Sequence, residues 1–170
     1  ETQTRGKTFF VTLAFQISTK HRPNFAIKHY ICGIKRFIPM ISFYSQDIEM
    51  PKLKRGALRE WIKAVTEKHG YKLGDISYIF CSDKRILEVN KQFLQHDYYT
   101  DIITFDDTEG KKISGDLFIS LDTVKSNSEQ LGTEYDTELH RVIIHGILHL
   151  CGINDKGPGE REVMEANENE

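Results

Sequence analysis

The sequence predicts an α/β (α+β) fold in which helices pack on a small mixed four-stranded sheet. Short apolar runs alternate with longer amphipathic stretches from residue 41 to residue 167, as is typical of folds that layer helices on a sheet. At 170 residues the chain is long enough for one domain to bury a core without disulfides or metal ions. No internal repeat or low-complexity tract interrupts the pattern.

The first half of this pattern predicts two strands and two helices. Ile41–Ser45 and residues 76–81 are short apolar runs of the kind that forms strands. Residues 53–69 carry apolar side chains at helical spacing and stop before a glycine, which predicts an amphipathic helix. We expect a second helix that has Asp83 as its N-cap and extends to Leu94.

The second half predicts two more strands and three helices. The strands are residues 102–105 and 114–119, and a polar, glycine-containing segment joins them as a hairpin or a lateral connection. Helical patterns then return over Leu121–Leu131, 134–151 and 159–167.

The helix over 134–151 is apolar nearly all round, which predicts that it is buried. It carries His145 and His149, which lie four residues apart and share one face, so both imidazoles can reach one ion. Gly152 suits the left-handed position after a helix end, and the turn that follows can bring the carboxylate of Asp155 to the same ion. The sequence therefore predicts a metal site at the end of a buried helix, with His145, His149 and Asp155 as ligands.

Two imidazoles and one carboxylate leave one coordination position open. Three protein ligands and a water are typical of a catalytic zinc, whereas structural zinc sites use four ligands and favour cysteines. We therefore expect one Zn²⁺ per chain and hydrolysis by a metal-activated water, with His145 as a catalytic residue. Two core histidines bonded to backbone carbonyls would be the alternative without a metal, but the helix-ending glycine and the acid after it favour the metal.

Zinc proteases with the same histidine spacing carry a glutamate directly after the first histidine as general base. Here that position is Gly146, so a peptidase would need a carboxylate base from outside the helix. Glycine in a helix interior costs about 1 kcal/mol relative to alanine. We therefore expect Gly146 to admit close approach by a neighbouring element or by the substrate.

Residues 145–152 read His-Gly-Ile-Leu-His-Leu-Cys-Gly. This segment resembles the signature of the YbeY family of endoribonucleases, which runs His-Gly-x-Leu-His-Leu-x-Gly and ends in a third ligand. Residues 100–105, Thr-Asp-Ile-Ile-Thr-Phe, are similar to that family's Thr-Asp-Val-Leu-Ser-Phe stretch, and residues 115–120 are similar to its following strand. The resemblance covers most of the chain from Met40 onward.

The sequence departs from the family pattern at two positions. The third ligand of the family is usually histidine, and the matching residue is Asp155; a carboxylate still binds zinc well, although its harder oxygen widens the choice of metal. Where the family usually has an arginine before the Thr-Asp stretch, this chain has Leu94. The charge of that arginine must come from elsewhere, for example from Lys91 or His96, or be absent.

The resemblance implies a single-strand-specific, metal-dependent endoribonuclease that matures the 3′ end of small-subunit ribosomal RNA and acts in ribosome quality control. Its implied partners are single-stranded RNA, ribosomal RNA and the small ribosomal subunit. The alternative is a non-catalytic, zinc-stabilised ribosome-assembly module, which would have a closed fourth coordination position. The oligomeric state stays open.

Four residues near the motifs have predictions of their own. Glu138 shares the face of His145 and could contact the ligand or the substrate, although a solvated acid in the first helical turn is favoured. Asp101 could accept the free ring N–H of a ligand histidine or make a turn into its strand. His140 is expected near the helix start or on the surface, and Cys151 in the core.

Charge is distributed unevenly along the chain. Residues 1–40 hold seven Lys or Arg and one acidic residue, so residues 41–170 carry a net charge of −8. Within that acidic part, residues 51–91 hold ten basic and five acidic residues. These basic residues either steer phosphates toward the metal or form ordinary solvated helix faces.

Residues 40–170 are predicted to form the metal-dependent hydrolase domain, and residues 1–39 an N-terminal extension outside it. The extension is basic, lacks sustained periodicity and holds no apolar run long enough to span a membrane. The three cysteines are odd in number and far apart, which argues against a disulfide framework and favours a reducing compartment. We therefore expect a cytoplasmic protein without membrane partners.

Overall fold

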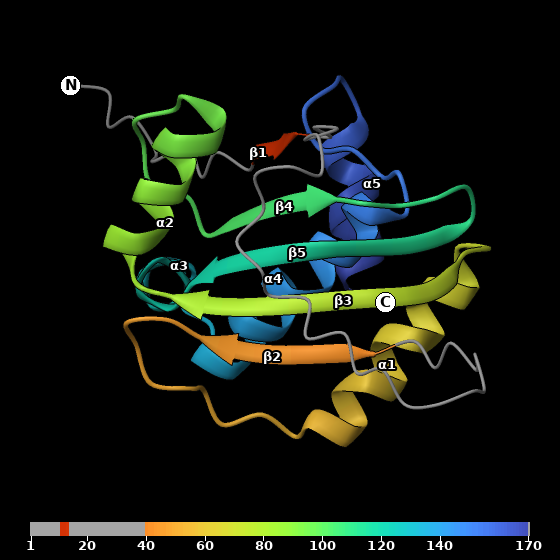
Figure 1. The fold of residues 1–170 in the computed structure, drawn as a ribbon, viewed down its shortest axis with the longest axis horizontal. Helices are drawn as coiled ribbons and strands as arrows, with labels where there is room; N and C mark the ends of the chain where they lie inside the picture. The colour runs from red at the N-terminus through yellow and green to blue at the C-terminus, as the bar shows by residue number, and fades with distance from the viewer. Residues whose placement is uncertain (1–10, 14–39, 170) are drawn as a thin grey trace, which may run out of the picture.

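The computed structural model describes residues 11–13 and 40–169. Its sheet has the strand order β1-β4-β5-β3-β2 (Figure 1). The strands are β1 (Val11–Leu13), β2 (Ile41–Ser45), β3 (Lys72–Cys81), β4 (Ile102–Asp106) and β5 (Lys112–Ser120). The four predicted strands all form, and β1 adds a strand at the β4 edge.

The sheet is mixed, as predicted. β4 and β5 are antiparallel and a short bridge between Glu109 and Lys112 closes their connection into a hairpin. The other neighbouring strands run parallel. The rest of the predicted extension, residues 1–10 and 14–39, lies outside the described residues, so its separation from the functional domain stays a prediction.

The helices agree with the predicted ones to within a few residues at each end. They are α1 (Arg55–Lys68), α2 (Asp83–Val89), α3 (Leu121–Leu131), α4 (Tyr135–Leu150) and α5 (Glu160–Glu168). In Figure 1, α4 lies behind the sheet with α5 beside it. A large core between the sheet and helices α1, α3 and α4 contains Ile62, Leu117 and Ile143. A smaller cluster, built on Ile86, Val89 and Ile103, joins α2 to the sheet.

The start of α2 differs from the prediction. Its N-cap is Ser82, whose hydroxyl accepts a hydrogen bond from the backbone N–H of Arg85 at 3.3 Å. Asp83 lies within the helix, and its carboxylate accepts hydrogen bonds from Ser120 and Thr123, each at 2.5 Å. Asp83 therefore links the start of α2 to the start of α3, a contact between distant segments that local spacing does not reveal.

The helix after Ser82 reaches Leu94 as predicted, but its last part is not α-helical. Residues Asn90–Leu94 form a π-helix, η1, which ends at Gln95 in the left-handed conformation with φ of 56°. The buried side chain of Asn90 donates to the carbonyl of Tyr98 at 2.8 Å. This bond fixes the loop that leads into β4.

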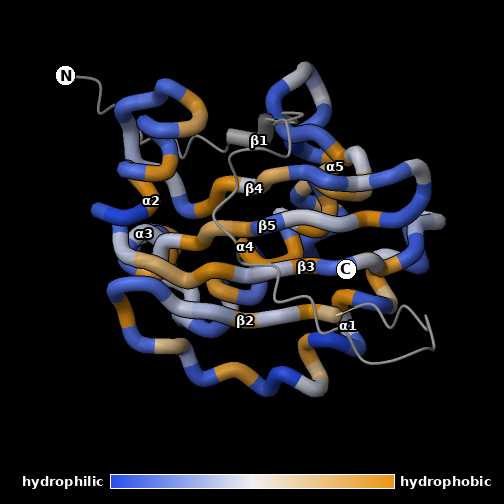
Figure 2. Tube along the Cα trace, viewed as in Figure 1, coloured by the Kyte–Doolittle hydropathy of each residue, from blue (hydrophilic) through white to orange (hydrophobic). Residues whose placement is uncertain are grey.

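Hydrophobic residues concentrate on the strands and on α4, and hydrophilic residues on the loops (Figure 2). None of the helices in the described part of the chain is long and apolar enough to cross a membrane. Most of the basic residues counted over 51–91 lie on α1 and α2. These two helices lie at opposite corners of the view in Figure 1. The role of these basic residues in steering phosphates stays a prediction.

Candidate metal centre

Helix α4 is buried along almost its whole length, as its apolar sequence predicts. Every residue from Val142 to Leu150 is buried. Gly146 faces the sheet, where a Cβ would overlap the Leu117 side chain and lie 2.8 Å from Cδ1 of Ile102. The expected close approach is thus made by β4 and β5. Because α4 lies so close to the sheet, its two histidines have fixed surroundings.

The end of α4 directs the chain back toward the histidines. Gly152 has φ of 83°, which favours glycine because a Cβ is disfavoured there. Its N–H donates to the carbonyl of His149 at 2.8 Å, and the N–H of Ile153 donates to that of Leu148 at 3.0 Å. These two bonds form a Schellman motif. The left-handed residue predicted at Gly152 is therefore present, and the chain after it carries Asp155 to the histidines.

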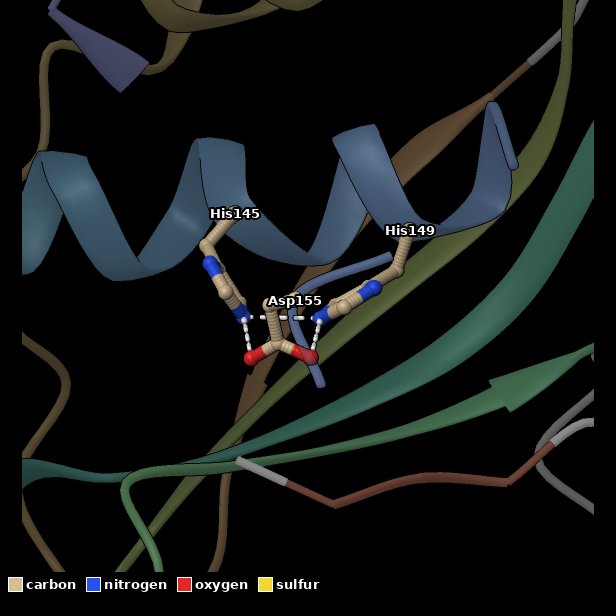
Figure 3. Close-up of side chains that lie close together, drawn as sticks. All are labelled: His145, His149 and Asp155. Carbon is tan, nitrogen blue, oxygen red and sulfur yellow. Dashed lines mark hydrogen bonds and ion pairs between the residues drawn. The ribbon is translucent and has the colours of Figure 1, made fainter. Parts of the chain in front are cut away.

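Figure 3 shows both imidazoles pointing from α4 toward the carboxylate of Asp155. Nε2 of His145 and Nε2 of His149 are 2.8 Å apart. The carboxylate oxygens of Asp155 lie 3.9 Å from Nε2 of His145 and 3.8 Å from Nε2 of His149. Potential ligand atoms of the three residues all lie within 4.8 Å of one another. The structure thus brings together the three residues that the sequence singled out.

The hydrogen bonds of the two rings determine where their protons lie. Nδ1 of His149 is 2.8 Å from the carbonyl of Ile153, which can only accept, so Nδ1 carries the proton. Nδ1 of His145 is 2.5 Å from a carboxylate oxygen of Glu168, and the same assignment follows. In the neutral form of each ring, Nε2 then carries a lone pair that points into the space between the two rings. Two facing lone pairs and a carboxylate form a donor set that fits a zinc ion.

The protonation of these groups agrees with metal binding. Burial, with a smaller effect of His145, lowers the pKa of His149 to about 3, so this ring is neutral at pH 7. Burial raises the pKa of Asp155, an effect that His145 opposes. A cation between the rings would favour the ionised carboxylate, because an opposite charge stabilises the charged form.

Two acids near the site differ from their expected roles. Glu138 is 2% exposed, and both of its oxygens accept hydrogen bonds from Arg141, at 2.7 and 2.9 Å. It is therefore not the solvated acid that the sequence favoured. Asp101 does not accept the ring N–H of a ligand histidine, because Glu168 is the partner of Nδ1 of His145. Its carboxylate accepts at 2.9 Å from the N–H of Ile102, which is the next residue, whereas an Asx-turn bonds the residue two positions on. Its other oxygen lies 3.7 Å from Nη2 of Arg141.

Glu168 is the residue of this site that the sequence analysis missed. It lies 23 residues after His145, too far for helical spacing to connect the two. One signal was available: Glu168 lies four residues after Met164, which is the buried residue of α5. Residues four apart share a face, so the pattern places Glu168 on the inward side of its helix.

Among the described residues, none of the others considered belongs to the ligand group. Leu94 packs against the small core cluster under α2. Lys91 forms an exposed ion pair with Asp97 at 2.8 Å. His140 bonds the carbonyl of Asp136 at 2.6 Å in the first turns of α4, and Cys151 is part of the large core. The last two agree with their predicted places.

Comparison with known proteins decides the family. A family model described as Endoribonuclease YbeY matches residues 40–170. The chain belongs to the YbeY family. The YbeY endoribonuclease of Parabacteroides distasonis is 72% identical over 129 residues, which are 76% of this chain and 91% of that protein. The YbeY endoribonuclease of Cytophaga hutchinsonii is 46% identical over 129 residues, 75% of this chain and 90% of that protein.

A solved structure agrees with this assignment. The solution structure of TM1509 from Thermotoga maritima is 26% identical, with a TM-score of 0.53, and the match covers 76% of this chain and 87% of that protein. Membership of the YbeY family, whose description is an endoribonuclease, confirms the predicted enzyme class, a hydrolase. The resemblance drawn from residues 145–152 and 100–105 is confirmed with it.

Proposed function

We propose that this chain is a single-strand-specific endoribonuclease that depends on one Zn²⁺ held by His145, His149 and Asp155. The observation that carries the proposal is the pair of facing Nε2 atoms, 2.8 Å apart, with the Asp155 carboxylate facing both (Figure 3). Two nitrogens bound to tetrahedral zinc lie roughly 3.3 Å apart. Small movements of the two rings would therefore be enough to admit the ion.

The chemistry that zinc supplies when bound is a water of lowered pKa and a positive charge near the phosphoryl oxygens. The chain's own residues hold the site in shape. His145 is the catalytic residue of the proposal, because its Nε2 faces the reacting centre and its Nδ1 is bonded to Glu168. His149 is fixed by the backbone carbonyl of Ile153, and Asp155 by the turn at Gly152.

Phosphate binding in this chain must differ from the family pattern. Leu94 supplies no charge, and the guanidinium of Arg141 is shared among three carboxylates. Lys91 is the better candidate, because its ion pair with Asp97 is exposed and such pairs are worth at most about 1 kcal/mol. A phosphate could replace Asp97 as the partner of Lys91 at little cost.

The proposed biological role goes beyond the relatives, whose name, endoribonuclease, supports RNA as the substrate. We assign this chain RNA as its substrate, and maturation of the 3′ end of small-subunit ribosomal RNA and ribosome quality control as its roles. Its partners would be single-stranded and ribosomal RNA and the small ribosomal subunit, in the cytoplasm. The non-catalytic alternative needs a fourth protein ligand, and among the described residues the ligand group has three.

The proposal is tested with bound metal and RNA cleavage measured on the same preparations. Wild type, His145→Ala and Asp155→Ala are compared by elemental analysis and by cleavage of a single-stranded ribosomal RNA fragment and its duplex form. We expect about one zinc per wild-type chain and preferential cleavage of the single strand. Both variants should lose metal and cleavage together.

His140→Ala is the matched control, since it changes a histidine of the same helix outside the ligand group. It should keep both metal and cleavage. Metal retained by Asp155→Ala would contradict the three-ligand site. Metal bound by a wild type that cleaves no RNA would favour the assembly module.

A further inference from the structure

A buried carboxylate, that of Glu168 on α5, accepts a hydrogen bond from Nδ1 of His145. Glu168 lies in the last turn of α5, and its side chain is 5% exposed. One of its oxygens is 2.5 Å from Nδ1 of His145. A carboxylate is rarely buried without a partner that favours its charge. The position of Glu168 therefore depends on the groups that surround it.

Arg141 supplies that partner. It lies one helical turn before His145 on α4, and its Nη1 is 3.2 and 3.3 Å from the two oxygens of Glu168. Its Nε and Nη2 donate to Glu138, and Nη2 lies 3.7 Å from Asp101. A planar guanidinium can hold several carboxylates at fixed angles. Arg141 thus joins α4, α5 and the start of β4 around one side of His145.

The contacts of Glu168 favour the ionised form of its carboxylate. Nη1 of Arg141 lies within hydrogen-bond distance of both carboxylate oxygens, and an opposite charge at that distance stabilises the charged form. An ionised carboxylate can only accept, so His145 must donate from Nδ1. The opposite tautomer would place a proton on Nε2, where the metal binds.

The cluster also provides negative charge next to the ligand group. One guanidinium faces three carboxylates, those of Glu138, Glu168 and Asp101. Asp155 adds another on the other side of the imidazoles. An excess of buried negative charge stabilises a nearby divalent cation.

We propose that Glu168 is a positioning residue that sets the tautomer and orientation of His145 for metal binding, and that Arg141 holds Glu168 in place. This inference rests on the proposed metal site and adds a residue from α5 to it. By accepting the Nδ1–H of a ligand histidine, a carboxylate makes Nε2 a stronger donor. His149, whose Nδ1 bonds a backbone carbonyl, lacks that charge.

The test compares Glu168→Gln, Glu168→Ala and the control Glu162→Gln. Glu162 lies in the first turn of the same helix and is exposed. Zinc affinity is measured by competition with a chromophoric chelator. The tautomer of His145 is measured in the metal-free protein from the ¹⁵N chemical shifts of its ring, and thermal unfolding reports the fold.

We expect Glu168→Gln to lower zinc affinity by about 10- to 100-fold and to shift the ¹⁵N signals of His145 toward a mixture of tautomers, because an amide can donate as well as accept. Glu168→Ala should lower the affinity at least as much, and Glu162→Gln should match wild type. If Glu168→Ala does not fold, Glu168→Gln decides, since it conserves shape.

Two results would separate the two proposals. Wild-type affinity and an unchanged tautomer in folded Glu168→Gln would overturn the role of Glu168 and leave the metal site intact. A wild type that binds no zinc would overturn the metal site and this inference with it. A loss of thermal stability with no change in tautomer or affinity would make Glu168 merely structural, which also overturns the proposal.

Discussion

At the scale of single residues, the two ligand histidines have different supports. The backbone carbonyl of Ile153 fixes His149, whereas His145 depends on the side chain of Glu168. Gly146, between them, has no side chain because Leu117 and Ile102 occupy the space that a Cβ would need. The ligand pair thus depends on the backbone carbonyl of Ile153, on the carboxylate of Glu168 and on the absence of a side chain at Gly146.

Gly146→Ala should destabilise the protein even though alanine is the better helix former. Overpacking against fully buried Leu117 costs about 1 to 3 kcal/mol, which outweighs a helix-propensity gain of about 1 kcal/mol. Urea unfolding of the metal-free protein measures the net effect. Gly56→Ala is the control, because a Cβ at that position meets nothing within 4 Å. This substitution should be neutral or stabilising. Greater stability of Gly146→Ala would refute this account of the helix–sheet contact.

His149 should make the metal-free protein sensitive to mild acid. Its pKa is lowered from 6.5 to about 3 by burial first and by His145 second, and its side chain is 2% exposed. The unfolded chain takes up this proton near pH 6.5, so stability is complete above that pH and falls as pH decreases toward 3.

The stability difference between wild type and His149→Gln isolates this contribution. Between pH 6.5 and 5 it should fall by about 1 to 2 kcal/mol, since each pH unit is worth at most about 1.4 kcal/mol. Urea unfolding in the presence of a chelator at several pH values gives the two curves. Parallel curves would show that His149 has an ordinary pKa in the folded state.

At the scale of elements, the site is made by the end of one helix and the turn after it. The Schellman bonds of Gly152 and Ile153 satisfy carbonyls at the end of α4 and set the direction of the chain toward Asp155. The geometry of the third ligand is therefore a consequence of how α4 ends.

Gly152→Ala should weaken both stability and metal binding. A residue with a Cβ in the left-handed conformation costs about 1 to 2 kcal/mol, and relief of that strain would move Asp155. Gly132→Ala is the matched control, because Gly132 ends α3 with φ of 67°. Unfolding experiments should show similar losses for both, while zinc competition should show a loss for Gly152→Ala alone. Equal zinc affinities would mean that Asp155 is placed independently of the turn.

At the scale of the whole molecule, local patterns predicted the elements, and three-dimensional packing decided the rest. The apolar periodicity of α4 and the strand runs were enough for the fold class, and the spacing of His145, His149 and Asp155 was enough for the ligand group. The cap at Ser82 was missed because Ser82 and Asp83 are both suitable N-caps, and the carboxylate of Asp83 is instead used by the distant Ser120 and Thr123. The burial of Glu138 was missed because it depends on packing with other elements. Glu168 was missed for the same reason, since its partners His145 and Arg141 belong to another helix.

Helix α5 is attached to the molecule by few contacts. Met164 is its buried residue, and its last turn is held by the bonds of Glu168 to Arg141 and His145. An element with so little buried apolar surface opens at a lower free energy than the core does. Each local opening separates Glu168 from His145, so slowed amide hydrogen exchange in α5 on adding zinc would measure directly how strongly ion binding and helix docking are coupled.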